Sequence, residues 1–225
     1  MSFSSRFEAI VLDLDGTLIE TAPDLTAALN HTLSYVGSPA IPPGVVRHMI
    51  GDGVRKLLVR GLQENKQFLD DKKIKSLHIK FLEYYRYHIA DHSHPFPGVI
   101  DTIRNLRSTG VKTAICTNKP LDLTLKLLNT IRMDYLFDAV VGGDTLPIKK
   151  PDGGHILGAL AAINTPPTAA LMIGDSGNDV MAAQNAGLPV VLVDYGYTSI
   201  PPIELGADKI IADFRDLPII MNNLE

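Results

Sequence analysis

Short apolar runs recur along the chain, and most of them are rich in β-branched residues and end at Gly, Pro, Asn or Asp. Such runs are typical of buried strands in a parallel sheet. They occupy residues 8–14, 111–116, 139–141, 170–174, 189–193 and 209–211. Helical periodicity lies between most of them, over residues 99–108, 121–130, 154–163 and 179–186. The alternation predicts an α/β fold with a doubly wound, Rossmann-like parallel sheet, whose ligands gather at the carboxyl ends of the strands.

The alternation is interrupted between residues 20 and 94, where helical periodicity dominates and no strand pattern is convincing. We expect helices there over residues 24–35, 45–50, 54–64 and 71–90. The segment 94–98 (HPFPG) follows, and its two prolines and glycine suit a stiff return to the sheet. The sequence therefore predicts an α/β core of residues 1–19 and 95–225 with a helical cap of residues 20–94 inserted into it.

Composition excludes several classes of protein. The 225-residue chain is 45% hydrophobic and carries a net charge of −4, which argues against disorder and against a broad nucleic-acid surface. A single cysteine, Cys116, excludes internal disulfides and fits a reducing compartment. The first residues lack the pattern of a secretory signal, and no uncharged apolar run reaches membrane-spanning length. We therefore expect a cytoplasmic protein without a membrane partner, either a monomer or a homodimer.

Two aspartates follow the first predicted strand, in the segment 13–18 (DLDGTL). Asp13 and Asp15 are two residues apart, so both are expected to project into one crevice. Gly16 permits a tight turn and a close approach of the backbone to a ligand. The alternative is an ordinary turn that ends a strand at an aspartate.

A second acidic segment, 174–179 (GDSGND), also follows an apolar run. Asp179 begins a helical pattern, so it could simply cap that helix. Capping explains Asp175 less well, because this residue lies at the end of the strand itself. The segment is therefore a second candidate for the site.

Polar and basic residues follow two further positions in the pattern. Thr117, Asn118 and Lys119 come after the run 111–116, where the hydroxyl and amide can bind phosphate or cap the next helix. Lys150 precedes the helical pattern at 154–163 and offers a fixed positive charge. Exposed lysines are common, so Lys150 carries little weight alone.

Together the four stretches resemble the motifs of the haloacid dehalogenase-like superfamily, which occur in this order at or after the ends of core strands. The matching residues, in motif order, are Asp13 and Asp15, Thr117, Lys150, and Asp175 with Asp179. The resemblance covers essentially the whole chain, including a helical cap after the first motif. Four ordered motifs in these contexts are highly specific.

The resemblance implies a Mg²⁺ ion. Carboxylates ~4 Å apart repel by roughly 4 kcal/mol at an effective dielectric constant of ~20, so four converging aspartates need a cation. Oxygen ligands suit magnesium, whereas zinc prefers His or Cys. The implied ligands are the side chains of Asp13 and Asp175 and the backbone carbonyl of Asp15, with Asp179 acting indirectly or through water.

The resemblance also implies roles in catalysis. Asp13 would attack phosphorus and form an aspartyl-phosphate, and Asp15 would serve as general acid and then general base. Thr117 and Lys150 would neutralise the phosphoryl oxygens. Asp15 favours a phosphatase, since the dehalogenases of the superfamily lack this second aspartate. The expected substrate-binding residues are Gly16, Gly51, Asp52, Gly53, Thr117, Asn118 and Lys150.

Within the superfamily the chain is similar to the phosphoglycolate phosphatase branch, which implies hydrolysis of 2-phosphoglycolate to glycolate and phosphate. The similar segments are 22–25 (APDL), 50–54 (IGDGV), 96–99 (FPGV) and 193–197 (VDYGY). The sequence departs from the usual pattern of this branch at two places. Glu20-Thr21 stands where relatives usually carry Asp-Ser, and the third motif lacks its usual second proline, which leaves Lys149 as a rival to Lys150 for contact with phosphate.

The cap segment 47–56 is the expected source of substrate selectivity. The backbone amides of Gly51 and Gly53 could approach a small anion, and four basic residues surround them: Arg47, His48, Arg55 and Lys56. A carboxylate would meet several donors there. The alternative is a glycine-containing turn between two helices with solvated basic side chains.

Other functions are compatible with parts of the pattern. Another small-metabolite phosphatase or a phosphomutase would share the motifs, whereas a phosphonoacetaldehyde hydrolase needs a Schiff-base lysine with no confident counterpart here. A non-catalytic sensor of phosphorylated metabolites predicts loss of Asp13 or Asp15, and a signalling receiver would be about half as long. His88, His92 and His94 are close enough in sequence to suggest zinc, but exposed hinge residues are the favoured interpretation.

Overall fold

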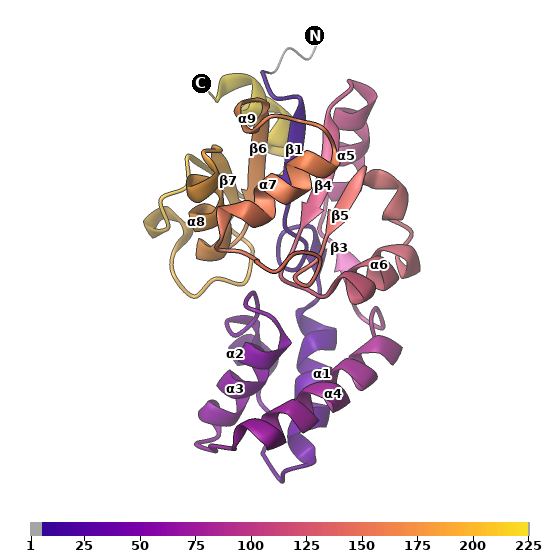
Figure 1. Cartoon of the computed structure of the whole chain (residues 1–225), viewed down its shortest axis with the longest axis vertical. Coiled ribbons are helices and arrows are strands. Elements are labelled where there is room, and N and C mark those ends of the chain that lie inside the picture. Colours follow the sequence, from indigo (N-terminus) through magenta and orange to yellow (C-terminus); the bar gives the residue numbers. More distant parts are fainter. Residues whose placement is uncertain (1–5, 225) are drawn as a thin grey trace.

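The computed structural model describes residues 6–224. The start of the chain, for which no secretory signal is predicted, lies mostly outside these residues. Figure 1 shows an α/β part built around a parallel sheet and, below it, a group of helices inserted after the first strand. The predicted fold class is therefore confirmed.

Within the described residues, six parallel strands form the main sheet, in the order β5-β4-β1-β6-β7-β8. Their bounds are β1 Ala9–Leu12, β4 Lys112–Cys116, β5 Ala139–Val141, β6 Ala170–Gly174, β7 Val190–Val193 and β8 Lys209–Ile211. β1 is central, with Ala9 opposite Lys112 on one side and Ala170 on the other. The strand order reverses at β1, and such a reversal opens a crevice at the carboxyl ends of the strands.

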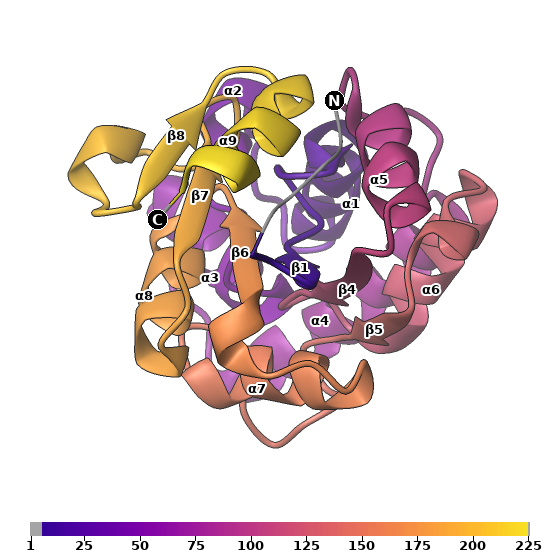
Figure 2. The same ribbon diagram turned by 90° about the horizontal axis from the view of Figure 1, so that it is seen from above.

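Helices cover both faces of this sheet (Figure 2). α7 (Gly153–Ala162) and α8 (Gly177–Ala186) lie on one face, and α5 (Val99–Ser108), α6 (Leu121–Thr130) and α9 (Leu217–Asn223) lie on the other. Side chains alternate between the faces of a strand, so Ala9 and Val11 pack with α7 and α8, whereas Ile10 and Leu12 face the opposite core. The sequence did not predict α9. Short 3₁₀ turns lie at Asp134–Leu136, Pro167–Ala169, Pro202–Glu204 and Phe214–Asp216.

The helical insert consists of α1 (Ala22–Ser34), α2 (Pro43–Arg47), α3 (Val54–Glu64) and α4 (Asp71–Tyr87). α3 has the predicted bounds. α2 ends three residues before the predicted end at residue 50. Gly51 follows with a φ of +112°, which is incompatible with a continuing right-handed helix.

One expectation for this region is wrong. The two-residue strands β2 (Ile19–Glu20) and β3 (His94–Pro95) pair antiparallel where the chain enters and leaves the insert. Two residues are too few to produce the alternating pattern that identifies a strand in a sequence. This two-stranded ribbon holds the segment that enters the insert beside the segment that leaves it.

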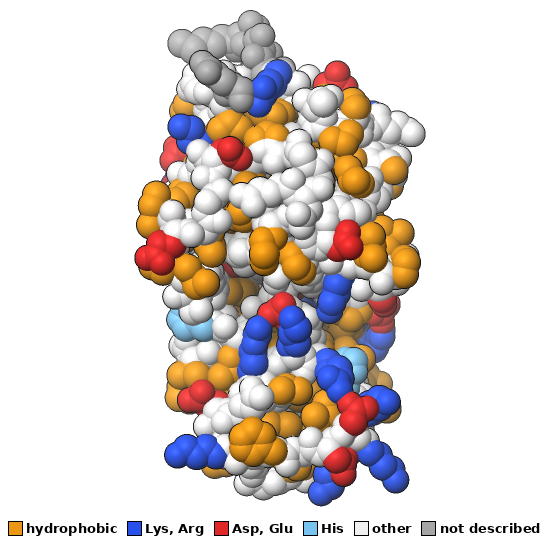
Figure 3. Space-filling model, turned by 60° about the vertical axis from the view of Figure 1, so that its left-hand side comes forward, with side chains coloured by type: hydrophobic (Ala, Val, Ile, Leu, Met, Phe, Trp, Pro, Cys, Tyr) orange, Lys and Arg blue, Asp and Glu red, His pale blue; other side chains and the backbone are white. Residues whose placement is uncertain are grey.

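The boundary between the sheet and the insert is visible on the surface. In the space-filling view of Figure 3 the molecule is hollowed at this level, and acidic and basic side chains gather there. Within residues 6–224, no helix combines the length and apolar character needed to cross a membrane.

Candidate active site

Three aspartates converge at the carboxyl edge of the sheet. Asp13 follows β1, Asp175 follows the adjacent β6, and Asp179 lies in the first turn of α8. All three are buried, and their carboxylate oxygens lie within 4.8 Å of one another. Among the described residues, this is the only group of three or more His, Cys, Asp or Glu side chains that could share an ion.

The turn after β1 depends on Gly16. Its φ is +86°, and a Cβ there would lie 2.5 Å from Asp175 Oδ2, so a side chain would collide with the aspartate group. The Gly16 N–H donates to the carbonyl of Ile19 at 3.0 Å. Gly16 therefore provides room, and its amide is already used within the turn.

Lys150 lies inside the aspartate group. Its Nζ is 2.8 Å from Asp13 Oδ1 and 2.6 Å from Asp179 Oδ1. Burial disfavours the ammonium, but Asp13 and Asp179 outweigh burial and raise the pKa of Lys150. The rival Lys149 is exposed, and its Nζ donates to the carbonyl of Asp52 at 3.2 Å. Of the two lysines, Lys150 is the one that contacts the carboxylates.

The aspartate group contains three carboxyl groups and a single ammonium group, so one lysine cannot balance the charge of all three aspartates. Burial raises the pKa of Asp13 to about 6, although Lys150 opposes the shift. Burial, together with Asp179 and Asp13, raises the pKa of Asp175 well above its usual range. Asp13 Oδ1 also lacks a well-aligned hydrogen bond among the described residues, despite its ion pair with Lys150. A buried set of carboxylate oxygens that resists ionisation suits a hard divalent cation, so these residues can hold a metal ion.

Asp179 makes two sets of contacts, one with each of its carboxylate oxygens. Its Oδ2 accepts from the backbone N–H groups of Asp175 at 3.2 Å and Ser176 at 3.1 Å. These bonds stabilise the start of α8, as expected for a capping residue. Its other oxygen pairs with Lys150.

Asp15 and Thr117 share a pocket with Asp13, although the carboxylate of Asp15 is not part of the aspartate trio. The active-site pocket is lined by Asp13, Asp15, Leu25, Ile50, Gly51, Gly53, Val54, Leu57, Tyr85, Thr117, Asn118, Lys119, Pro120 and Leu123. Asp15 Oδ1 accepts from Thr21 Oγ1 at 2.6 Å. Thr117 is buried at the end of β4, and its Oγ1 accepts from the N–H of Lys119 at 3.3 Å.

Asn118 joins the insert to the core. Its Nδ2 donates to the carbonyls of Gly51 and Lys150, each at 3.0 Å. The carboxylate of Asp52 faces Lys56 at 2.9 Å and also Arg60. Gly51, Gly53 and Asn118 line the pocket, whereas Asp52 does not. The side chains of Asn118 and Asp52 also contact protein groups, and binding of the substrate by these four residues stays a prediction.

The four basic residues of the segment 47–56 do not line the active-site pocket. Each has a partner elsewhere: Glu20 and Tyr195 for Arg47, Tyr197 for His48, Asp71 for Arg55 and Asp52 for Lys56. His48 instead lines a neighbouring pocket together with Asp15 and Asp175, and the expectation that these residues meet the substrate stays a prediction. Neighbouring acidic and carbonyl groups satisfy these side chains, and sequence spacing does not reveal those contacts.

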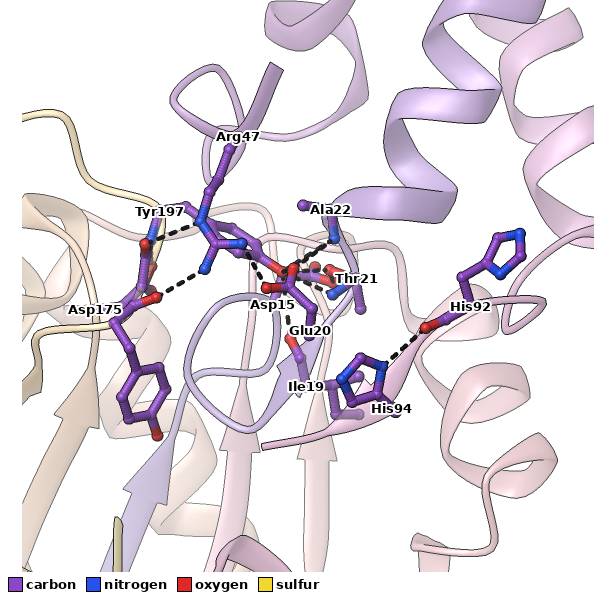
Figure 4. A network of polar contacts seen from close by, with 12 residues as sticks. Asp15, Ile19, Glu20, Thr21, Ala22, Arg47, His92, His94, Asp175 and Tyr197 are labelled. Carbon is purple, nitrogen blue, oxygen red and sulfur yellow. Dashed lines mark hydrogen bonds and ion pairs between the residues drawn. The ribbon is translucent and has the colours of Figure 1, made fainter. Parts of the chain in front are cut away.

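A second polar network lies beside the aspartate group (Figure 4). The N–H of Tyr197 donates to Asp175 Oδ2 at 2.7 Å, and its hydroxyl accepts from the N–H of Thr21 at 2.7 Å. The same hydroxyl donates to Glu20 at 2.7 Å, and the guanidinium of Arg47 lies 4.6 Å above the ring. The network links Asp175 to the entry of α1 and to α2 of the insert.

The three histidines near the return to the sheet make separate local contacts. His88 Nδ1 is 2.7 Å from Asp91 Oδ2, and His94 Nδ1 is 2.9 Å from the carbonyl of His92. Figure 4 shows the rings of His92 and His94 pointing apart. They do not form the kind of cluster that binds zinc.

Lys119 was noted in the sequence next to Thr117 and Asn118, but no function was predicted for it. The structure buries it in the active-site pocket, with Nζ 2.9 Å from Asp15 Oδ1 and 2.7 Å from the hydroxyl of Tyr85 on α4. Its position two residues after Thr117 at a strand end was the one feature of the sequence that could have identified it as a site residue. No feature of the sequence distinguished Tyr85, since it is one of several aromatic residues on that helix.

A doubly wound sheet, an aspartate trio with a buried lysine at the carboxyl edge, and a helical insert beside it define a class of α/β enzymes whose aspartate site can hold a metal ion. Residues 10–193 match the haloacid dehalogenase-like hydrolase family, and the chain belongs to this family.

Relatives and solved structures agree with this assignment. The chain is 45% identical to the phosphoglycolate phosphatase of Caulobacter vibrioides, over 93% of this chain and 88% of the relative. A crystal structure of a predicted phosphoglycolate phosphatase from Haemophilus somnus superimposes with a TM-score of 0.90 at 32% identity, covering 96% of this chain and 98% of that one. CbbY from Rhodobacter sphaeroides, solved in complex with phosphate, is 26% identical with a TM-score of 0.79, over 97% and 100% of the two chains.

Proposed function

We propose that this protein is a magnesium-dependent phosphomonoesterase that hydrolyses 2-phosphoglycolate to glycolate and phosphate. The observation that carries the proposal is the contact of Lys150 with both Asp13 and Asp179 beside Asp175. This arrangement supplies a nucleophilic carboxylate, a fixed cation for the phosphoryl group and a set of oxygen ligands for a metal. Relatives named phosphoglycolate phosphatase, at 45% and 37% identity, support the choice of substrate.

The side chains of Asp13 and Asp175 and the backbone carbonyl of Asp15 would hold Mg²⁺, with Asp179 supporting them. When bound, the ion would neutralise the carboxylates and the phosphoryl oxygens. This assignment fits the raised pKa values of Asp13 and Asp175, which mark a site short of positive charge.

The proposed reaction has two displacements. An oxygen of Asp13 attacks phosphorus, and the bond from phosphorus to the leaving oxygen breaks while Asp15 donates a proton to that oxygen. Asp15 then accepts a proton from a water molecule that attacks the aspartyl-phosphate, which releases phosphate and restores Asp13. Lys150 and Thr117 balance the charge on the phosphoryl oxygens in both steps.

We further propose that residues 20–94 act as a cap over a catalytic core of residues 1–19 and 95–225. The contacts of Asn118 with Gly51, and of Lys149 with Asp52, hold the cap segment against the core. A closed cap excludes water from the site and strengthens its electrostatic contacts.

Phosphate release from a panel of phosphorylated metabolites, with magnesium or with a chelator, tests the proposal. We expect the highest kcat/KM for 2-phosphoglycolate, loss of activity with the chelator and recovery with Mg²⁺. Asp13→Asn should abolish turnover, while Glu83→Gln, at an exposed carboxylate of α4, should leave it unchanged. Full turnover without metal would contradict the proposed site, and a clear preference for a sugar phosphate would favour another phosphatase or a phosphomutase.

A further inference from the structure

The active-site pocket contains one basic side chain among its described lining residues, and that side chain is Lys119. The other charged lining groups are Asp13 and Asp15. Most of the remaining wall is aliphatic, from Leu25, Ile50, Val54, Leu57, Pro120 and Leu123. An anionic group that enters such a pocket loses its hydration and needs a cation in return.

Lys119 is held in a defined position. Its Nζ donates to Asp15 Oδ1 at 2.9 Å and to the Tyr85 hydroxyl at 2.7 Å. An ammonium group has three hydrogens, and these two bonds are the only ones found for Nζ among the described residues, so one hydrogen remains for a ligand. Burial disfavours its charge, but Asp15 and Tyr85 outweigh burial and raise the pKa of Lys119.

The inference rests on the proposed function, in which Asp15 protonates the leaving oxygen. In 2-phosphoglycolate a single methylene carbon joins that oxygen to the carboxylate. Because Lys119 Nζ contacts Asp15 directly, a carboxylate one carbon beyond an oxygen that Asp15 protonates would come within reach of Lys119. We infer that Lys119 binds the carboxylate of the substrate and selects short phosphorylated carboxylic acids.

The insert supports this subsite from the other side. Tyr85 lies on α4, is fully buried and keeps its phenolic proton, because burial raises its pKa to about 12. Leu25 and Leu57 add apolar wall from α1 and α3. A sugar phosphate would place several hydroxyls against these aliphatic side chains without partners, which disfavours it.

A merely structural Lys119 would position Asp15 and therefore affect every substrate alike. The distinguishing measurement is the ratio of kcat/KM for 2-phosphoglycolate to kcat/KM for 2-hydroxyethyl phosphate, in which a hydroxymethyl group replaces the carboxylate. Wild type, Lys119→Met, Lys119→Arg and Tyr85→Phe are compared, with Lys73→Met at an exposed position of α4 as the matched control.

We expect Lys119→Met to lower this ratio by about 100-fold, mainly through KM for the acid, since a hydrogen bond to a charged group is lost. Lys119→Arg should retain most of the ratio, Tyr85→Phe should lower it about fivefold, and Lys73→Met should not change it. If Lys119→Met does not fold, Tyr85→Phe, which removes one oxygen, carries the test. Equal losses on both substrates would overturn the inference. A wild type that prefers another phosphorylated acid would overturn the choice of 2-phosphoglycolate, while a ratio that still collapses in Lys119→Met would support the carboxylate subsite.

Discussion

Replacing Asp13 by asparagine tests whether the aspartate group opposes folding when no cation is bound. Burial raises the pKa of Asp13 from 3.8 to about 6, so between these values the folded state binds more protons than the unfolded state. The free energy of unfolding of the metal-free protein must therefore fall as the pH rises through this window. Ionisation of Asp13 alone lowers the free energy of unfolding by at most about 3 kcal/mol above pH 6.

Asparagine has nearly the same shape and does not ionise, so Asp13→Asn avoids this loss. We expect the metal-free variant to be about 2–3 kcal/mol more stable than wild type at pH 7.5 and nearly equal to it at pH 4. Urea denaturation followed by circular dichroism, at both pH values with a chelator, measures the difference. Glu83→Gln makes the same chemical change at an exposed position and should shift the free energy of unfolding by less than about 0.5 kcal/mol.

Magnesium provides the second half of this test. A ligand that binds only the folded state stabilises it, so Mg²⁺ should stabilise wild type at pH 7.5 and should stabilise Asp13→Asn much less. The reasoning is refuted if the metal-free variant is less stable than wild type at pH 7.5, because the carboxylate would then be favourable without a cation.

Asp15→Asn should lower kcat for an alkyl phosphate by about 10³-fold but lower it far less for p-nitrophenyl phosphate, whose leaving group needs no proton; similar losses in steady-state assays would remove Asp15 from the acid role. Gly16→Ala should cost at least about 2 kcal/mol of stability and 100-fold in kcat, since its Cβ would lie 2.5 Å from Asp175 Oδ2 and 2.9 Å from the Tyr197 ring; denaturation and turnover check this, and wild-type turnover would contradict it. Cys116 is fully buried and its pKa is raised to about 12 by burial, so mass spectrometry should detect its alkylation by iodoacetamide at pH 8 only after denaturation; rapid labelling of the native protein would show that the thiol is accessible.

Local patterns were sufficient for the six strands of the main sheet, the inserted helices and the order of the four motifs. A strand buried on both faces appears in the sequence as an apolar run, and its carboxyl end is known once the run is found. Asp13 and Asp175 could therefore be assigned to one edge of the sheet before their distance was known. The ribbon of β2 and β3 was too short to leave such a pattern.

Only the tertiary structure shows which of two chemically similar residues, adjacent in the sequence, enters the site. Lys150 enters the aspartate group while Lys149 turns to Asp52, although the two are adjacent and equally charged. Lys119 and Asp15 are 104 residues apart in the chain, and their contact depends on the packing of β4 against β1. Sequence patterns report which residues are buried and where strands end, because these depend on local hydrophobicity. Which polar group faces which partner depends on the packing of distant segments, and therefore only the folded chain determines it.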